Sequence, residues 1–348
     1  MTSVYADSSR GAALVRARSP LRIDFVGMTD YRPACRQFGG CIVNATINKY
    51  IYATARRRHD SRIVLRAPDH DLVVELPSKE ALDPAGQLGL AQAVLQRFPL
   101  DCGLELTTYS EMPSGAGLGS SSTIATCVIG LLNAMLGHRL SDYEVAEQAI
   151  ACERIALNTE YGWQDQYSPV TGGGIKFMRH YPDAEGGTIE VNQLPAAPAE
   201  LAELEKRLVV CYTGISRPAK SILDKVAAGV REGEAEVTGA LRAMSDCAQG
   251  LRRAFLAHEL EGLGEILDQV WRLHKSLHPD VTNDRLEELH AVAMGRGALG
   301  GRVCGAGGGG TMLFYCQQNA EYAVKRALTE AGARVFDFSF SLAGLTIW

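Results

Sequence analysis

The sequence predicts a protein of two domains, an N-terminal α/β domain followed by a smaller α+β domain. The chain has 348 residues, whereas a single domain usually has about 100–200. Short runs rich in Val, Ile and Tyr are interspersed with helical segments, which indicates that both domains combine strands and helices. The composition changes at residues 191–206, the most linker-like stretch, so we place the domain boundary near residue 200. We expect a flexible tail at 1–15, the N-terminal domain at 16–200 and the C-terminal domain at 201–348.

Composition and charge exclude several classes of protein. Hydrophobic residues make up 46% of the chain and charged residues 22%, as in ordinary packed proteins. The net charge of −5 argues against a nucleic-acid-binding protein, which would carry a basic face. No apolar stretch reaches the roughly 18–20 residues that span a bilayer, and the N-terminus lacks the apolar core of a secretory signal. We therefore expect a cytoplasmic protein with no nucleic-acid or membrane partner; both a monomer and a homodimer remain open.

The nine cysteines are scattered and never spaced CxxC. A disulfide framework or a zinc site would show pairs at short, fixed spacing. Most of the cysteines have apolar neighbours, so we expect small buried side chains in a reducing compartment.

The N-terminal half begins with short strands and continues with helices. Strands are expected in RSPLRIDFVG, INKYIYATARRR, SRIVLRAP, HDLVVELP and CGLELTTYSEM, and a helix in QLGLAQAVLQRF. The dense apolar segment SSSTIATCVIGLLNAMLG predicts a buried helix that stops at Gly137. In SDYEVAEQAIACERIAL, Ser141 is followed three residues later by Glu144, a capping box that predicts the start of a further helix.

The C-terminal half predicts a strand, several helices and a strand–helix–strand unit. The strand RLVVCYTG is followed by helices in SRPAKSILDKVAAGV, residues 233–258, LGEILDQVWRLHKSLH and DRLEELHAVAMGRG. The strand TMLFYCQ, the helix NAEYAVKRALTEAG and a last strand ARVFDFSFSLAG complete it. This order is typical of a small α+β unit.

The glycine-rich segment PSGAGLGSSST, residues 113–123, is the strongest functional signal. It lies between a predicted strand and the start of the long apolar helix, where backbone N–H groups and the helix dipole favour a phosphate. No lysine follows the last glycine, so the segment is not a Walker A loop. The charge of a triphosphate would instead need Mg²⁺, which a serine hydroxyl could help to hold. A glycine turn with a serine cap is the alternative.

A second cluster, at residues 305–310, has five glycines in six residues. The cluster contains GxGxxG, but a strand rather than a helix follows it, so the dinucleotide-binding interpretation fails. Close approach of the backbone to a ligand is favoured over a tight hairpin turn.

Four charged residues are candidates for chemistry on a substrate. Asp165, in the polar segment WQDQY, is suited to accept the proton of a substrate hydroxyl, although a lone Asp is more often a turn or cap residue. Glu153 lies twelve residues earlier, either beside the same site or on a solvated helix face. Arg22, on a predicted strand, and Asp30, in the following turn, could flank a polyhydroxylated substrate.

Taken together, these segments resemble the GHMP kinases, named for galacto-, homoserine, mevalonate and phosphomevalonate kinases. The three family motifs occur in order as RSPLRIDFVGMTDY, PSGAGLGSSST and CGAGGGG, and the resemblance spans residues 16–345. The resemblance implies a ribosomal-S5-like α/β N-terminal domain, a ferredoxin-like α+β C-terminal domain and an active site between them. It also implies transfer of the γ-phosphoryl group of ATP to an alcohol, with Mg²⁺ as cofactor.

The resemblance further implies a role for each candidate residue. Asp165 would accept or orient the proton of the acceptor hydroxyl, and Arg22 would stabilise that aspartate and the transferring phosphoryl group. Ser121 and Glu153 would bind Mg²⁺. The residues implied in ATP binding are Pro113, Gly115, Ala116, Gly117, Leu118, Gly119, Ser120, Ser121 and Ser122. Those implied in substrate binding are Thr29, Asp30, Gly40, Gly173, Gly307 and Gly308.

Within the family, the strings FGGCIVNATINKYIYA, WQDQYSPVTGGG and GALGGRVCGAGGGGTMLFY are most similar to the D-glycero-D-manno-heptose 7-phosphate kinases. This similarity implies a sugar phosphate as substrate and the 1,7-bisphosphate as product. The subgroup usually has a lysine before QDQ, where this chain has Trp163, and GGGTD where this chain has GMTD. A galactokinase- or fucokinase-like kinase of an unphosphorylated sugar stays open as an alternative, as does a non-catalytic sugar or nucleotide sensor.

Overall fold

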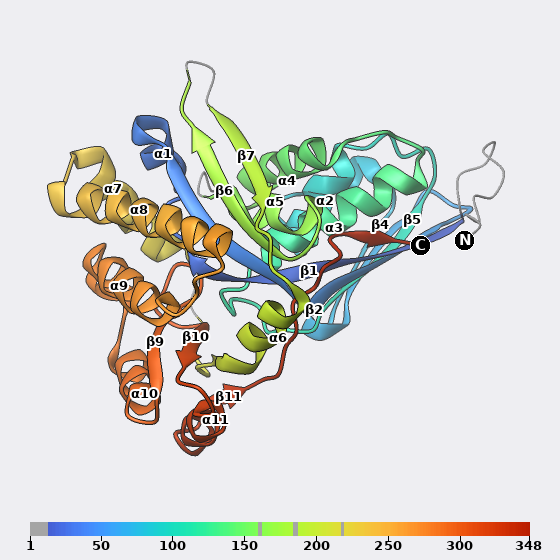
Figure 1. Cartoon of the computed structure of the whole chain (residues 1–348). Coiled ribbons are helices and arrows are strands. Elements are labelled where there is room, and N and C mark those ends of the chain that lie inside the picture. The colour runs from blue at the N-terminus through green and yellow to red at the C-terminus, as the bar shows by residue number, and fades with distance from the viewer. Residues whose placement is uncertain (1–12, 159–161, 184–186, 217–218) are drawn as a thin grey trace.

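Two β-sheets, each with its own helices, organise the chain. The computed structural model describes residues 13–158, 162–183, 187–216 and 219–348. Within these residues one sheet has eight strands and the other four, and the small sheet lies at the lower left of Figure 1. Most of the tail expected at 1–15 falls outside the described residues.

The eight-stranded sheet forms the N-terminal domain around one long strand, β2 (Gly40–Arg57). The first half of β2 pairs with β6 and its second half with β5, while β1 runs antiparallel along its other edge. The strand order is β12-β1-β2-β5-β3-β4, with β7 attached to β6. The other strands are β1 (Leu14–Val26), β3 (Ile63–Ala67), β4 (Leu72–Leu76), β5 (Leu104–Ser110), β6 (Ile175–Tyr181), β7 (Thr188–Gln193) and β12 (Thr346–Ile347).

Helices cover one face of this sheet. α3 packs against β1 and β2, and most of its side chains are buried. α4 begins at the predicted capping box, where the Ser141 hydroxyl accepts the N–H of Glu144. α5 packs against α3, α4 and the two long strands. The bounds of the helices in this domain are α1 (Arg32–Phe38), α2 (Gly89–Gln96), α3 (Ser120–Met135), α4 (Asp142–Leu157) and α5 (Gln164–Val170).

The four-stranded sheet forms the C-terminal domain, with the antiparallel strand order β11-β8-β10-β9. This order, with helices after the first strand and α11 before the last, is the ferredoxin-like arrangement that the sequence predicts. The strands are β8 (Leu208–Tyr212), β9 (Ala298–Val303), β10 (Thr311–Cys316) and β11 (Arg334–Val335). The helices are α6 (Pro198–Arg207), α7 (Ala219–Glu232), α8 (Ala235–Ala257), α9 (Leu263–Ser276), α10 (Asp284–Met294) and α11 (Glu321–Glu330).

The two domains are joined by α8 and by the end of the chain. α8 packs against both β2 and α9, so it spans the joint (Figure 1). The C-terminal segment then returns to the large sheet: Phe340 bridges to Ile47, and the Trp348 N–H donates to the Arg16 carbonyl at 2.9 Å. Residues 339–348 thus pack with the N-terminal domain, although in the sequence they follow the boundary expected near residue 200.

Three segments differ from the expected elements. The last strand, expected over 333–344, is regular only in β11, because the chain then crosses to the other domain. The linker-like stretch 191–206 contains the end of β7 and most of α6, and the β6–β7 hairpin was not expected. The strand β9, which contains Gly300 and Gly301, was not expected either, and a side chain on Gly301 would collide with Phe314. Among the described residues, no helix is both long and apolar enough to cross a bilayer.

Candidate active site

Asp165, near the start of α5, and Arg22, on β1, form a bidentate ion pair. The Arg22 Nε lies 2.7 Å from Asp165 Oδ1, and its Nη2 lies 2.9 Å from Oδ2. Arg22 is almost fully buried, whereas a quarter of the Asp165 side chain is exposed. Burial disfavours the guanidinium charge, but Asp165 and Asp24 outweigh burial and raise the pKa of Arg22 above its ordinary value. The pair therefore holds a partly accessible carboxylate in a fixed orientation.

Asp24 extends this pair across the domain joint. Arg22 Nη1 donates to Asp24 Oδ1 at 2.9 Å, and Arg302 Nη2 from β9 lies 3.3 Å from Oδ2 of the same carboxylate. The Gly305 N–H also donates to Asp24 at 3.3 Å. Neither Asp24 nor Arg302 was expected from the sequence to belong to the site. Asp24 was recognisable, because Arg22 and Asp24 are two residues apart and so share one face of a strand, but nothing in the sequence pairs them with Arg302.

Glu153, on α4, is buried between a serine and a glutamine. Ser122 Oγ donates to its two carboxylate oxygens at 2.9 and 3.0 Å, and Gln166 Nε2 donates to Glu153 and lies 3.0 Å from Ser122 Oγ. Burial raises the pKa of Glu153 to about 7, although hydrogen bonds from Gln166, Ser122 and Ser121 oppose it. A buried carboxylate of this kind gains from a cation nearby. Of the two serines, Ser121 is exposed and Ser122 is buried.

The glycine-rich segment 113–119 leads directly into α3. Gly115, Gly117 and Gly119 have φ values of 73°, 75° and 78°, a conformation that favours glycine. A Cβ on Gly119 would also lie only 3.0 Å from the Asp165 carboxyl carbon. The hydroxyl of Ser120, the first residue of α3, is buried and has no hydrogen-bond partner. Free N–H groups at a helix N-terminus beside an unpaired hydroxyl are suited to a phosphate.

The second glycine cluster, 305–310, packs against the first. Arg22 donates to the Gly117 carbonyl, a Cβ on Gly117 would lie 2.6 Å from the Cys304 carbonyl oxygen, and one on Gly310 would lie 2.9 Å from that of Ala116. Glycine is thus required here partly because two backbones touch.

Gly307 and Gly308 face protein rather than an open cleft. A Cβ on Gly307 would lie 2.6 Å from the Val281 carbonyl oxygen, and the Gly308 N–H donates to that same oxygen at 2.7 Å. These contacts support the turn alternative for this part of the cluster more than contact with a substrate.

Asp30 lies beside the start of α5, close to the pair of Asp165 and Arg22. Its Oδ2 accepts the N–H groups of Trp163 and Gln164 at 3.1 and 3.3 Å. Burial, followed by the charge of Asp165, raises the pKa of Asp30 to about 6. The Thr29 hydroxyl donates a hydrogen bond to the Cys41 carbonyl. The structure therefore brings Asp30 to Asp165, while Thr29 supports the backbone beside it.

The remaining glycines named from the sequence have packing contacts. Gly40 lies against the Thr29 backbone, where a Cβ would lie 2.8 Å from Cys35 Sγ. Gly173 lies against the returning C-terminal segment, where a Cβ would lie 2.5 Å from the Ala343 nitrogen. The space beside Gly173 is therefore filled by the C-terminal segment.

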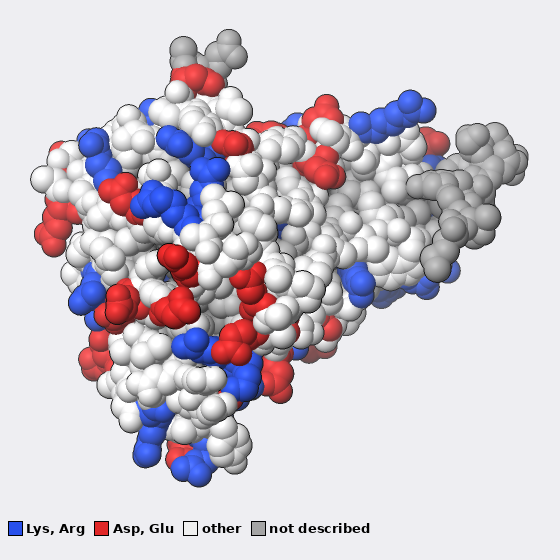
Figure 2. Space-filling model, viewed as in Figure 1, with Lys and Arg blue, Asp and Glu red and all other residues white. Residues whose placement is uncertain are grey.

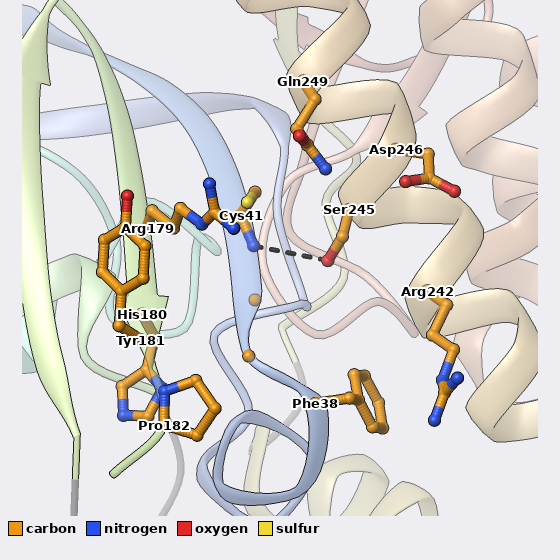
Figure 3. Close-up of a pocket in the computed structure, with 12 residues that line it drawn as sticks. Phe38, Cys41, Arg179, His180, Tyr181, Pro182, Arg242, Ser245, Asp246 and Gln249 are labelled. Carbon is orange, nitrogen blue, oxygen red and sulfur yellow. Dashed lines mark hydrogen bonds between the residues drawn. The ribbon is translucent and has the colours of Figure 1, made fainter.

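A pocket of about 330 Å³ lies elsewhere, between β6 and α8 (Figure 3). It is lined by Arg179 and Arg242, among others, and Figure 2 shows basic residues gathered where β6 meets α8. Cys41, in its wall, is three residues from Asn44, whose side chain bonds to Gln164. Successive side chains on a strand alternate in direction. The pocket is therefore on the face of β2 opposite to Asp165.

The fold and these groups define a class of protein, the small-molecule kinases: phosphoryl transfer needs charge neutralisation and in-line positioning more than covalent chemistry. Comparison with known families makes the class specific. Residues 87–173 match the model of the GHMP kinases N terminal domain, and residues 251–334 match that of the GHMP kinases C terminal.

Two relatives extend the match beyond these segments. The chain is 34% identical over 340 residues to D-glycero-alpha-D-manno-heptose 7-phosphate kinase of Campylobacter jejuni, covering 96% of this chain and 98% of the relative. It is 30% identical to the bifunctional fucokinase/GDP-fucose pyrophosphorylase of Arabidopsis thaliana, over 85% of this chain but 29% of that protein. This chain belongs to the GHMP kinase family, and it is an ATP-dependent phosphotransferase.

Solved structures agree with this assignment. A D-glycero-D-manno-heptose 1-phosphate kinase from Bacteroides thetaiotaomicron superposes with a TM-score of 0.78 at 28% identity, over 96% of this chain and 98% of that one. Lactococcus lactis galactokinase, in complex with galactose, superposes with a TM-score of 0.77 at 19% identity, over 99% and 96% of the two chains. The second likeness concerns the fold alone.

Proposed function

We propose that this kinase phosphorylates D-glycero-D-manno-heptose 7-phosphate at its anomeric hydroxyl and forms the 1,7-bisphosphate. The observation that carries the substrate is the 34% identity, over 96% of the chain, with the heptose 7-phosphate kinase of Campylobacter jejuni. The 28% identity with a heptose 1-phosphate kinase of known structure also favours a heptose phosphate. The fucokinase relative is matched over only 29% of its length, so fucose is the weaker candidate.

In this proposal, ATP binds with its phosphates at the N-terminus of α3. The positive φ values at Gly115, Gly117 and Gly119 and the unpaired Ser120 hydroxyl support this position. Each helix end leaves N–H groups without intrahelical partners, and these groups bind phosphate oxygens.

Glu153 would hold Mg²⁺ together with the hydroxyls of Ser121 and Ser122. Among the described residues, no group of three or more His, Cys, Asp and Glu side chains could hold a metal. A site with one carboxylate fits Mg²⁺, which usually keeps water and substrate phosphates as its remaining ligands. When bound, the ion neutralises the charge of the phosphates.

Asp165 is the proposed acceptor of the sugar hydroxyl proton. Its carboxylate is oriented by both Arg22 nitrogens and retains partial exposure. Proton transfer to a positioned group of this kind is typically worth 10²–10⁴ in rate. Arg22 would hold the carboxylate in place before transfer, and Asp30, with its pKa near 6, would accept hydrogen bonds from other sugar hydroxyls.

A screen of ADP release with Mg²⁺ and ATP tests the substrate directly. The panel contains the heptose 7-phosphate, the unphosphorylated heptose, galactose, fucose and mevalonate. We expect the highest kcat/KM with the heptose 7-phosphate, and a second phosphorus signal at the anomeric position in the ³¹P spectrum of the product. Turnover restricted to unphosphorylated sugars or to mevalonate overturns the proposed substrate.

A further inference from the structure

Two arginines lie beside the proposed site without a defined task. Arg32 is the first residue of α1 and follows Asp30 by two residues. Arg154 directly follows Glu153 on α4. Both are half-buried. α4 packs against α5, the helix that carries Asp165, and Arg154 is close enough to Arg32 to act on its charge.

Some guanidinium nitrogens of both arginines are buried without hydrogen-bond partners. The Nε of Arg32 and the Nε and Nη2 of Arg154 are inaccessible to solvent and bonded to nothing. In the part of the chain that the structure describes, neither arginine forms an ion pair. A buried guanidinium without hydrogen bonds is costly, because it loses water and gains no replacement.

The surrounding charges do not cancel those of the two arginines. Arg154 and Arg36 both repel Arg32, and together with burial they lower its pKa, while Glu147 opposes them. Glu147 is exposed and already accepts the Tyr167 hydroxyl at 2.6 Å. Two other arginines and one acid thus act on the charge of Arg32. An anion between Arg32 and Arg154 would remove the repulsion and satisfy the unpaired nitrogens.

We propose that Arg32 and Arg154 bind the phosphate that the sugar already carries before phosphoryl transfer, so that they select a sugar phosphate over the free sugar. This inference rests on the proposed function. A phosphate monoester dianion would pair with both cations, and a planar guanidinium donates to two of its oxygens at once. Trp163 cannot serve in this way, because its indole is fully buried and stacks on His180.

The arginines of the pocket on the opposite sheet face have a different environment. The Arg179 guanidinium lies 4.5 Å from the ring centre of Tyr181, and that of Arg242 lies 4.8 Å from that of Phe38. Arg179 is also half-buried and, among the described residues, forms no ion pair. It is therefore a matched control for the loss of one arginine.

Kinetics of Arg32→Gln and Arg154→Gln with phosphorylated and unphosphorylated heptose test the inference. Loss of a hydrogen bond to a charged group should raise KM for the heptose 7-phosphate at least about tenfold in each variant. We expect kcat to change less than about threefold and KM for the free heptose less than about twofold. Arg154→Lys should recover part of the loss, since it restores the charge without the planar donor. Arg179→Gln should leave all these constants within about twofold.

Thermal unfolding and phosphate inhibition complete the test. Because each substitution relieves repulsion in the free protein, Tm should stay the same or rise, whereas a structural role predicts a fall. Inorganic phosphate should inhibit the wild-type enzyme competitively against the sugar phosphate, and this inhibition should weaken in both variants. Unchanged KM for the sugar phosphate in both variants overturns the subsite and leaves the proposed function intact. A wild-type enzyme that does not turn over any sugar phosphate overturns the proposed function and this inference with it.

Discussion

The ion pair of Asp165 with Arg22 combines a rigid partner with a partly open carboxylate. Arg22 is fixed by Asp165, Asp24 and the Gly117 carbonyl, so it cannot swing away when substrate binds. Asp165 retains a quarter of its side-chain exposure. The fixed arginine and open carboxylate support Arg22 as the orienting group and Asp165 as the group that meets the substrate.

Asp165→Asn should lower kcat at least about 100-fold, because the amide keeps the shape but cannot accept the proton. KM for ATP should change little, since the phosphates are bound by other groups. Single-turnover kinetics of the purified variant measure the effect, and Asp246→Asn, from the pocket on the other sheet face, is the control. Retention of more than about a tenth of the wild-type rate would contradict the proton-acceptor role.

Glu153 makes stability depend on pH in a direction opposite to that of most acids. Its pKa in the folded protein is about 7, above the ordinary 4.5, so the folded protein keeps a proton that the unfolded chain releases in this range. The free energy of unfolding of the metal-free protein should therefore fall as pH rises from 4.5 to 7. Each tenfold difference in proton affinity is worth about 1.4 kcal/mol, so the loss should be a few kcal/mol.

Urea unfolding at pH 5 and pH 8, without nucleotide or metal, measures this dependence. Glu153→Gln should lack this part of it, and the comparison with wild type removes the contribution of Asp30, which has the same sign. Mg²⁺ with ATP should flatten the wild-type curve, since a bound cation favours the ionised carboxylate. Equal slopes in wild type and variant would refute the assignment.

Among the elements, the short loop between β5 and α3 contains a glycine that lies directly against Asp165. Gly119 combines a φ of 78° with close contact to Asp165. Gly137, at the other end of α3, has a φ of 68°, but a Cβ there would meet nothing within 4 Å. A substitution at Gly137 therefore tests backbone strain alone, whereas one at Gly119 tests strain together with contact with Asp165.

Gly119→Ala and Gly137→Ala should each destabilise the protein by about 1–2 kcal/mol, the cost of a left-handed conformation with a Cβ. Only Gly119→Ala should also lower kcat, by about tenfold or more, because its methyl group would displace the Asp165 carboxylate. Thermal unfolding and steady-state kinetics on both variants give the comparison. A similar loss of kcat in Gly137→Ala would mean that loop strain, rather than displacement of Asp165, is responsible.

At the scale of the whole molecule, a buried ion pair between Arg302 and Asp24 connects the two domains. Arg302 of the C-terminal domain is fully buried and lies beside Asp24 of the N-terminal domain, while its Nη1 donates to the Phe25 carbonyl at 3.2 Å. Removal of one member of a buried pair leaves an uncompensated charge. The same carboxylate also binds Arg22, so the domain contact and the ion pair of Arg22 with Asp165 share one group.

Arg302→Met should lower the free energy of unfolding by about 3–5 kcal/mol. It should also lower kcat, because Asp24 would then be held by Arg22 and the Gly305 N–H alone. Thermal unfolding and kinetics below Tm measure the two effects. Arg296→Met, at an exposed arginine of the same domain, should stay within about 0.5 kcal/mol of wild type. A stable Arg302→Met variant with wild-type kcat would contradict the coupling.

Signals in the sequence were sufficient to predict the family and the fold class, and to single out Arg22 and Asp165. The capping box at Ser141 and Glu144, the stop near Gly137 and the glycine loop before α3 all depend on neighbouring residues, so their structural effect can be predicted from short segments. The motif order predicted the GHMP kinase fold, which the comparisons confirm. The sequence also singled out Arg22 and Asp165, which lie 143 positions apart and form the ion pair.

Only the tertiary structure determined which distant groups share a contact. Arg302 meets Asp24 across the domain joint, Gly173 meets the returning C-terminal segment, and Gly308 donates to Val281. Each of these contacts depends on how two elements that are distant in the sequence pack together. A pattern in a short segment does not predict that packing. The pKa of Glu153 and the unpaired nitrogens of Arg32 and Arg154 have the same origin, because burial is a property of the packed chain and not of its residue types.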